Sequence, residues 1–132
     1  MLDLSRRFAY TEEHHMFRDT VRKVFAQHLE PFLDEHERNG IVPREVWKAV
    51  GEAGLLCPTV KPENGGLGLD FGYCAVVGEE MAYLGSSAGF TLQSDITANY
   101  FERLGTDEQR ARYLPGMVSG DIITAIAMTE PG

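Results

Sequence analysis

A pair of residues near the start of the sequence has the spacing of metal ligands. Glu12 and His15 lie three positions apart, as in the Glu-x-x-His motif of a di-iron site in a helical bundle. Such a site needs a second pair of this kind and two more inward glutamates, and the sequence contains no second pair. His14 and His15 are neighbours that point to different helix faces, so we expect both at the surface near a helix start. The sequence therefore predicts no metal site.

A glycine-rich run, GGLGLD over residues 65–70, has the composition of a phosphate-binding loop. A dinucleotide fingerprint also needs a third glycine at the correct spacing and a strand before it, and neither is present. We interpret the run as a turn whose glycines adopt positive φ angles.

Residues suited to nucleophilic or acid–base catalysis are equally sparse. No serine or cysteine lies in a nucleophile-elbow pattern. Asp95 and Glu102 are seven positions apart, a spacing that is common on solvated helix faces. Cys57 and Cys74 form no CxxC pair, and we expect two small buried side chains. No catalytic residue is predicted within the chain.

The last residues, 121–132, form the sequence DIITAIAMTEPG. Their apolar run, bounded by Gly120 and Pro131, is typical of a short buried strand. Glu130 precedes the proline and is expected to be extended. A lone strand leaves its backbone donors and acceptors unsatisfied when it is buried. We therefore expect its sheet to lie beyond residue 132, which makes this chain the front part of a longer protein.

Composition narrows the class of protein. The 132 residues are 43% hydrophobic and 24% charged, as in one globular domain. Twelve basic and twenty acidic residues give a net charge of −8, which argues against binding to nucleic acid or to an anionic membrane. The N-terminus lacks the apolar core of a signal peptide, and no apolar run is long enough to span a bilayer. We expect a cytoplasmic protein.

Helical segments account for most of the sequence. Their expected starts are Thr11, Pro43, Asp70, Ser86 or Ser87, and Thr106. Thr106 and Gln109 form a capping box. Pro31 is expected to kink the first segment or to start a second helix there, and Pro115 is expected to interrupt the last. The predicted fold is an all-α bundle of about five helices that ends in the first strand of a β domain.

Five stretches resemble the acyl-CoA dehydrogenase family, and they occur in the order found in that family. FRDTVRKVFAQHLEP and PREVWKAVGEAGLL resemble its first two helices, and PENGGLGLD resembles its glycine-rich loop. GTDEQRARYLPGMVSGD resembles the fifth helix, and AIAMTEPG, the most specific stretch, resembles the hinge before the β domain. The similarity runs from about Phe8 to Gly132. FTLQSDITANYF together with AIAMTEPG is most similar to the long-chain branch.

The resemblance implies two parts, an N-terminal helical domain at 1–120 and the first strand and flavin-contacting hinge of a middle β domain at 121–132. It implies an FAD-dependent oxidoreductase of fatty acid β-oxidation that α,β-desaturates medium- to long-chain acyl-CoA thioesters. A carboxylate base takes the α-proton, hydride passes to the flavin, and electrons leave through an electron-transfer flavoprotein. The family assembles as a homotetramer. Its base lies in a later helical domain, so residues 1–132 alone are expected to be inactive.

The resemblance also assigns site residues. Met128 and Thr129 are expected against the flavin, with Ile126 close by. A capping or turn role before Glu130 is the alternative for Thr129, and Glu130 itself is expected to be structural.

Four residues of the fourth helix are expected to line the acyl pocket, namely Ala88, Gly89, Leu92 and Ile96. They fall on one face of a regular helix at i, i+1, i+4 and i+8. Small side chains at the first two positions would leave a deep slot. Packing against neighbouring helices is the alternative for each residue.

Two other functions are compatible with the sequence. One is a free-standing helical module that binds an acyl group or a partner protein without redox chemistry. The unpaired terminal strand argues against it. The other keeps the fold and changes the reaction, to that of an acyl-CoA oxidase or a flavin monooxygenase.

Overall fold

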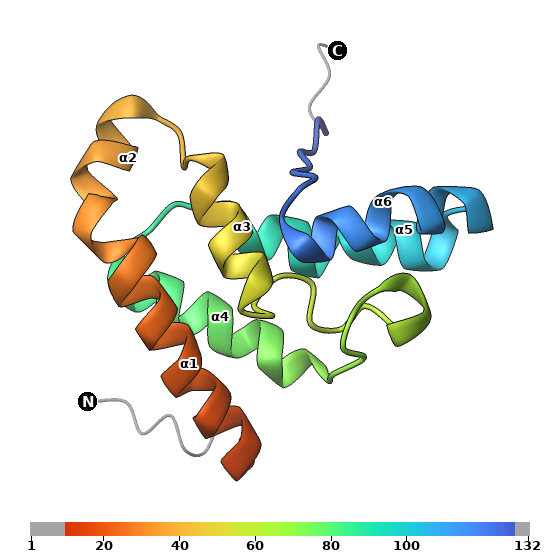
Figure 1. Ribbon diagram of the computed structural model, residues 1–132, viewed down its shortest axis with the longest axis horizontal. Coiled ribbons are helices and arrows are strands. Elements are labelled where there is room, and N and C mark those ends of the chain that lie inside the picture. The colour runs from red at the N-terminus through yellow and green to blue at the C-terminus, as the bar shows by residue number, and fades with distance from the viewer. Residues whose placement is uncertain (1–9, 129–132) are drawn as a thin grey trace.

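The computed structural model describes residues 10–128, which fold into a helical bundle (Figure 1). The α-helices are α1 (Glu12–His28), α2 (Leu33–Asn39), α3 (Arg44–Glu52), α4 (Phe71–Leu84), α5 (Ala98–Leu104) and α6 (Asp107–Ser119). A π-helix, Leu92–Thr97, leads directly into α5, and 3-10 turns occupy Glu30–Phe32 and Pro62–Asn64. Helix α1 packs on α4, α5 packs on α6, and α3 contacts both pairs. The all-α bundle is confirmed.

Thr11, Asp70 and Thr106 start helices, as the sequence predicts. The start expected at Ser86 or Ser87 was wrong, because residues 86–88 are not helical and the helical backbone begins at Phe90. The side chains of Thr11 and Thr106 each accept a hydrogen bond from the backbone N–H three residues later, and both form capping boxes. Asp70 accepts the Gly72 N–H at 2.7 Å and starts α4. Each cap satisfies an N–H that has no partner inside its helix.

Pro31 and Pro115 have different effects on the helices around them. Pro31 separates α1 from α2, as expected, because a 3-10 turn replaces helix at this point. Pro115 was predicted to interrupt the last helix, and this prediction was wrong because α6 continues to Ser119. Leu114 and Met117 beside the proline are fully buried. Burial of two such side chains, roughly 1.5–3 kcal/mol each, offsets a proline penalty of about 3 kcal/mol.

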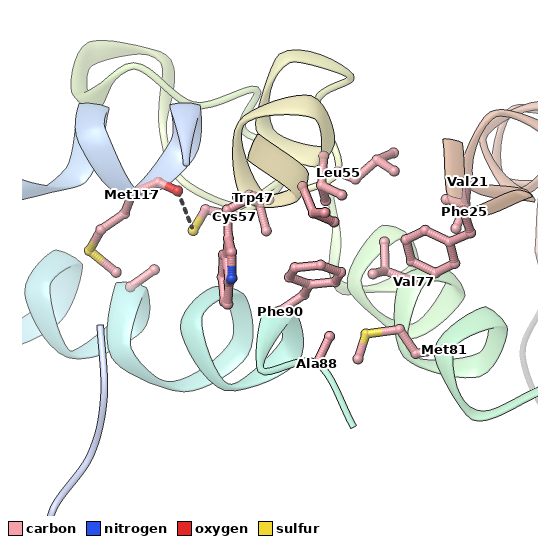
Figure 2. Close-up of a cluster of buried hydrophobic side chains, with 14 of the residues drawn as sticks. Val21, Phe25, Trp47, Leu55, Cys57, Val77, Met81, Ala88, Phe90 and Met117 are labelled. Atoms are coloured by element: carbon pink, nitrogen blue, oxygen red, sulfur yellow. Dashed lines mark hydrogen bonds between the residues drawn. The ribbon is translucent and has the colours of Figure 1, made fainter. Parts of the chain in front are cut away.

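Phe90 lies at the centre of the core between the two helix pairs (Figure 2). Its ring meets Trp47 of α3 edge to face, with centroids 4.7 Å apart, and lies 6.2 Å from Phe25 of α1. Cys57 and Cys74 are buried free thiols, as predicted. The core therefore joins α1, α3 and α4 to the segment that leads into α5.

His14 is buried, whereas the sequence predicted a surface residue. Its Nδ1 accepts the Thr11 N–H at 3.1 Å, which leaves Nε2–H to donate to Asp70 at 3.0 Å. The ring also lies 4.4 Å from that of Tyr73. Because position 14 is the third residue of α1, its side chain reaches both the cap of its own helix and the cap of α4. His15 is exposed, as expected.

Candidate functional site

The chain leaves the bundle after α6, where two glycines let α3 and α6 approach closely. Gly120 has φ of +80°, and a β-carbon there would collide with the backbone carbonyl of Trp47 in α3. A β-carbon on Gly51 of α3 would collide with the backbone of Ser119. Only glycine permits this approach, so the two positions fix where the exit segment, Asp121–Met128, begins.

Charged side chains of α3 hold the first residue of the exit segment. Lys48 Nζ lies 2.9 Å from Asp121 Oδ1, and Arg44 Nη1 donates to the Asp121 carbonyl at 3.3 Å. The hydrogen bond from Lys48 is the main reason that the pKa of Asp121 lies below its usual value. The N–H of Ile122 then donates to the Gly116 carbonyl at 2.9 Å. Beyond this turn the segment projects away from α5 and α6 (Figure 1).

A buried glutamine side chain forms hydrogen bonds with the exit segment, as a neighbouring strand would in a sheet. Gln93 is fully buried. Its Nε2 donates to the Met117 carbonyl at 2.8 Å, and its Oε1 accepts the Thr124 N–H at 2.9 Å. The hydroxyls of Thr97 and Thr124 lie 2.7 Å apart. The backbone N–H of Thr124 is thus satisfied by a side-chain amide oxygen, which takes the place of a strand neighbour.

The strand expected at 121–132 is not formed in the part of the chain that the structure describes. Residues 123–128 have no regular secondary structure, and residues 129–132 lie outside the described range. A strand needs a neighbour for its ladder, and residues 10–128 contain no strand to supply one. The strand and the domain division at residue 120 therefore stay predictions.

A π-helix brings the polar residues of this region onto one buried side. In a π-helix hydrogen bonds run from i to i+5, which shifts the side chains relative to an α-helix. Gln93, Ser94 and Thr97 of Leu92–Thr97 are all buried. Ser94 Oγ accepts the Cys57 N–H at 2.9 Å, and Thr97 Oγ1 donates to the Gln93 carbonyl at 3.0 Å. Such π-helical turns are frequent at functional sites.

The four predicted acyl-pocket residues do not share one cavity. Ala88 is buried, and with Gly89 it lines a cavity of about 520 Å³ against Trp47 of α3. Ile96 is 43% exposed and lines a separate hollow of about 460 Å³ beside α5. Leu92 is half-buried and lines neither of these two. The i, i+4, i+8 spacing assumed one regular α-helix, but Ala88 and Gly89 precede the helical backbone, which begins at Phe90, and Leu92 and Ile96 lie in the π-helix.

Asp95 lies at the edge of the hollow that contains Ile96. One oxygen of its carboxylate, Oδ1, is buried without a hydrogen-bond partner. Burial raises the pKa of Asp95, and the neighbouring Cys74 thiol opposes this only in part. Asp95 therefore accepts a proton more readily than a solvated carboxylate does.

Other reactive groups are closed off from solvent or dispersed. Burial raises the pKa of the Cys57 thiol to about 12, so at neutral pH it is not a nucleophile. Between residues 10 and 128, no three His, Cys, Asp or Glu side chains gather closely enough to hold a metal ion. Within the same range no helix is long and apolar enough to cross a membrane.

The comparison with protein families decides what kind of site this is. Residues 11–121 match the model described as "Acyl-CoA dehydrogenase, N-terminal domain". The chain belongs to the acyl-CoA dehydrogenase family. It is 41% identical over 133 residues to the mitochondrial long-chain specific acyl-CoA dehydrogenase of Rattus norvegicus. This alignment covers 100% of the chain and 31% of the rat protein.

Solved structures of acyl-CoA dehydrogenases have the same fold. The enzyme from Geobacillus kaustophilus matches with a TM-score of 0.88 and 46% identity, over 96% of this chain and 33% of that one. The enzyme from Bacillus anthracis, solved in complex with FAD, matches with a TM-score of 0.80 and 30% identity, over 93% of this chain and 22% of that one. The chain thus spans about a third of the length of the curated relatives it matches.

The exit segment is where the acyl-CoA dehydrogenase resemblance places the flavin contacts. Met128 is 78% exposed, Ala125 and Ala127 are exposed, and Ile126 is half-buried. A run of small or flexible apolar side chains open to solvent suits the face of a flat heteroaromatic ring. Thr129, the other predicted contact, lies outside the described residues. The described part of the segment therefore fits FAD.

Sequence reasoning missed Gln93, Thr97 and Thr124, the residues that hold this segment. Composition does not mark these three residues, because Gln93 and Ser94 lie among other polar residues, including Thr91, Asp95 and Asn99. The partners of the three missed residues are 24 to 31 positions away in the sequence, so no local pattern identified the pairs.

Proposed function

We propose that this chain is the N-terminal helical part of an FAD-dependent acyl-CoA dehydrogenase that α,β-desaturates medium- to long-chain fatty acyl-CoA thioesters. The observation that carries the proposal is similarity over the whole chain, exit segment included, to a long-chain specific enzyme. The flavin accepts the β-hydride of the substrate. A carboxylate beyond residue 132 takes the α-proton, and no catalytic base is assigned to residues 1–132.

The part played by these residues is to bind and orient the cofactor. Ile126 and Met128, with Thr129, contact the flavin. Gly120 and Gln93 hold the segment that carries them against the bundle. Once a ring covers the exposed apolar side chains, water is excluded from that face, which strengthens the polar interactions around it.

The acyl chain is proposed to run past Ala88 and Gly89, which precede the helical backbone, and along Leu92 and Ile96 of the π-helix. Because Ala88 and Gly89 line one hollow and Ile96 lines another, the proposal needs one variant for each hollow. A β-carbon on Gly89 would meet the Trp47 ring at an ordinary 3.8 Å, so Gly89→Leu adds bulk without a backbone clash. Ile96→Trp adds bulk to the other hollow.

Turnover of acyl-CoA substrates from four to sixteen carbons distinguishes the hollows. The variant in the hollow that holds the chain should lose about tenfold or more in kcat/KM for the longest substrates and little for the shortest. Gly89→Ala is the control for Gly89→Leu because it adds a single carbon. Equal losses at all chain lengths in both variants would remove these residues from the acyl pocket.

Several features of the whole protein belong to the same proposal. Electrons pass from the reduced flavin to an electron-transfer flavoprotein, and the complete protein is a homotetramer. A cytoplasmic location is also part of the proposal. The rat relative is named as a mitochondrial protein.

The visible spectrum of the protein purified from its complete gene tests the proposed function. One flavin per chain is expected, and anaerobic addition of palmitoyl-CoA should bleach its absorption band. A flavin that bleaches and then passes its electrons directly to oxygen, but not to an electron-transfer flavoprotein, would indicate an oxidase. A product without flavin would favour a helical binding module instead.

A further inference from the structure

Gln93 is fully buried, and both polar atoms of its side chain have hydrogen-bond partners. Its Nε2–H donates to the Met117 carbonyl, and its Oε1 accepts from both the N–H and the hydroxyl of Thr124, at 2.9 and 3.3 Å. Burial of an amide is unfavourable unless such partners are present. A plain core position would be filled more simply by an apolar side chain. The amide therefore has a task other than packing.

The two groups that Gln93 joins lie on either side of the turn from α6 into the exit segment. Met117 is in the last turn of α6, and Thr124 follows the turn. The Met117 carbonyl also accepts from the Cys57 thiol at 3.8 Å, as the dashed line in Figure 2 shows. A contact between the Thr97 and Thr124 hydroxyls adds a second link to the π-helix. Gln93 thus binds both ends of the turn, and we call its bonds to Met117 and Thr124 the clamp.

The clamp lies very close to the residues assigned to the flavin. Thr124 is two positions before Ile126, and a chain advances at most about 3.6 Å per residue. Within residues 10–128, Thr124 is the last residue of the exit segment with a described hydrogen bond to the bundle. The direction of the backbone at Thr124 therefore sets where the next few residues lie.

We propose that Gln93 is a positioning residue, whose side-chain amide sets the direction in which the exit segment leaves the bundle and thereby the fit of Ile126 and Met128 to the flavin. This inference rests on the proposed function. Gln93 does not touch the reacting atoms in this scheme. It acts through Thr124, as a residue that holds a ligand-contacting segment in one orientation.

The test uses the complete flavoprotein with the substitution Gln93→Met, which keeps length and apolar bulk and removes the donor and the acceptor. After the flavin is stripped, the Kd for added FAD is measured by fluorescence titration, and the visible circular dichroism of the bound flavin is recorded. We expect the Kd to rise by about tenfold or more, since buried hydrogen bonds of this kind are lost. The visible circular dichroism bands should change in shape.

Ser94→Ala is the matched control. Ser94 is the next residue of the same π-helix and is also buried, but its hydroxyl holds Cys57 and not the exit segment. It should lower Tm as Gln93→Met does, yet keep the FAD Kd within about twofold, because the bonds of Gln93 to Met117 and Thr124 stay in place. Thr124→Val, at a half-buried position, removes the hydroxyl and keeps the N–H, so a smaller change in the direction of Gln93→Met is expected.

Each outcome decides the inference. If Gln93→Met lowers Tm as Ser94→Ala does but leaves the FAD Kd and the visible bands of wild type, Gln93 only stabilises the fold and the inference is overturned. If Gln93→Met does not fold, Thr124→Val takes its place, and an unchanged Kd and spectrum overturn the inference in the same way. Absence of flavin from the wild-type protein would overturn the proposed function itself, and this inference with it.

Discussion

At the scale of single residues, Glu80 holds α1 and α4 together. It is 7% exposed and accepts from Arg18 Nη1 at 2.7 Å and from Arg22 Nε at 2.8 Å. We expect Glu80→Gln to lower the free energy of unfolding at pH 7 by about 2–3 kcal/mol, because it removes the buried negative charge that pairs with half-buried Arg18 and with Arg22. Urea denaturation of residues 1–132, followed by the fluorescence of Trp47, the sole tryptophan, measures the change.

The pH dependence of this loss gives a second check. Burial disfavours the ionised form of Glu80, but hydrogen bonds from Arg22 and Arg18 outweigh it and hold the pKa of Glu80 below its usual value. The stabilisation is therefore complete above the unfolded pKa of about 4.3 and is lost as pH falls through the folded value. The difference between wild type and Glu80→Gln should shrink below about pH 4. Glu79→Gln, at a more exposed carboxylate with one arginine partner, should cost less. A constant difference from pH 7 to pH 3 would contradict this account.

Thiol chemistry provides another prediction about single residues. Cys57 is fully buried and Cys74 is 2% exposed, and burial raises the pKa of both thiols. Because the thiolate is the reactive form, neither should react with a disulfide reagent such as Ellman's reagent at pH 8 while the chain is folded. Both should react at once in concentrated urea. Rapid titration of one thiol per native chain would show that the region around it opens readily.

At the scale of elements, the contact between α3 and α6 depends on Gly120. Alanine there requires a left-handed backbone and also places a β-carbon against the Trp47 carbonyl. Gly85 has a similar φ of +74° with open space around it, so Gly85→Ala isolates the backbone effect. We expect Gly85→Ala to cost about 1 kcal/mol and Gly120→Ala at least about 2 kcal/mol more, because α3 and α6 have to separate. Equal losses in the two urea melts would mean that the helices part without penalty.

The elements that the sequence predicts well are those defined by local chemistry. Thr11, Asp70 and Thr106 were identified as caps because a cap and the N–H groups it serves are within three residues of each other. The break at Pro31 follows from its own ring. Long-range pairs such as Gln93 with Thr124 left no such local pattern, since tertiary packing alone brings them together.

Local rules also fail where tertiary packing outweighs them. Pro115 should end α6 on propensity alone, yet buried neighbours on both sides keep the helix intact. The π-helix at Leu92–Thr97 is a similar case, because the buried hydrogen bonds of Gln93 and Thr97 match a wider turn than apolar spacing predicts. The predicted acyl-pocket residues line different hollows because Ala88 and Gly89 lie before the helical backbone, whereas Ile96 lies within the π-helix.

At the scale of the whole molecule, the bundle has an apolar face that its own described residues do not cover. Ile96, Tyr100 and Leu104 recur every four residues along the π-helix and α5, and are 43%, 56% and 76% exposed. Met128 at the end of the exit segment is more exposed still. The chain spans about a third of the length of its curated relatives, and it supplies only one wall of the proposed site.

Residues 1–132 alone, which form only part of the proposed site, should bind a flavin weakly and should not reduce it. We expect residues 1–132, mixed with FAD and palmitoyl-CoA in the absence of oxygen, to leave the flavin absorption band unchanged over hours. The proposed base belongs to a part of the protein beyond residue 132, and an unassembled site cannot hold substrate and ring in reacting geometry. In the complete protein, treated in the same way, the flavin band should bleach within seconds to minutes. This control shows that the reagents are active. Bleaching by residues 1–132 alone would place a functional base inside this chain, and half-buried Asp95, with its raised pKa, would then be the first carboxylate to replace by asparagine.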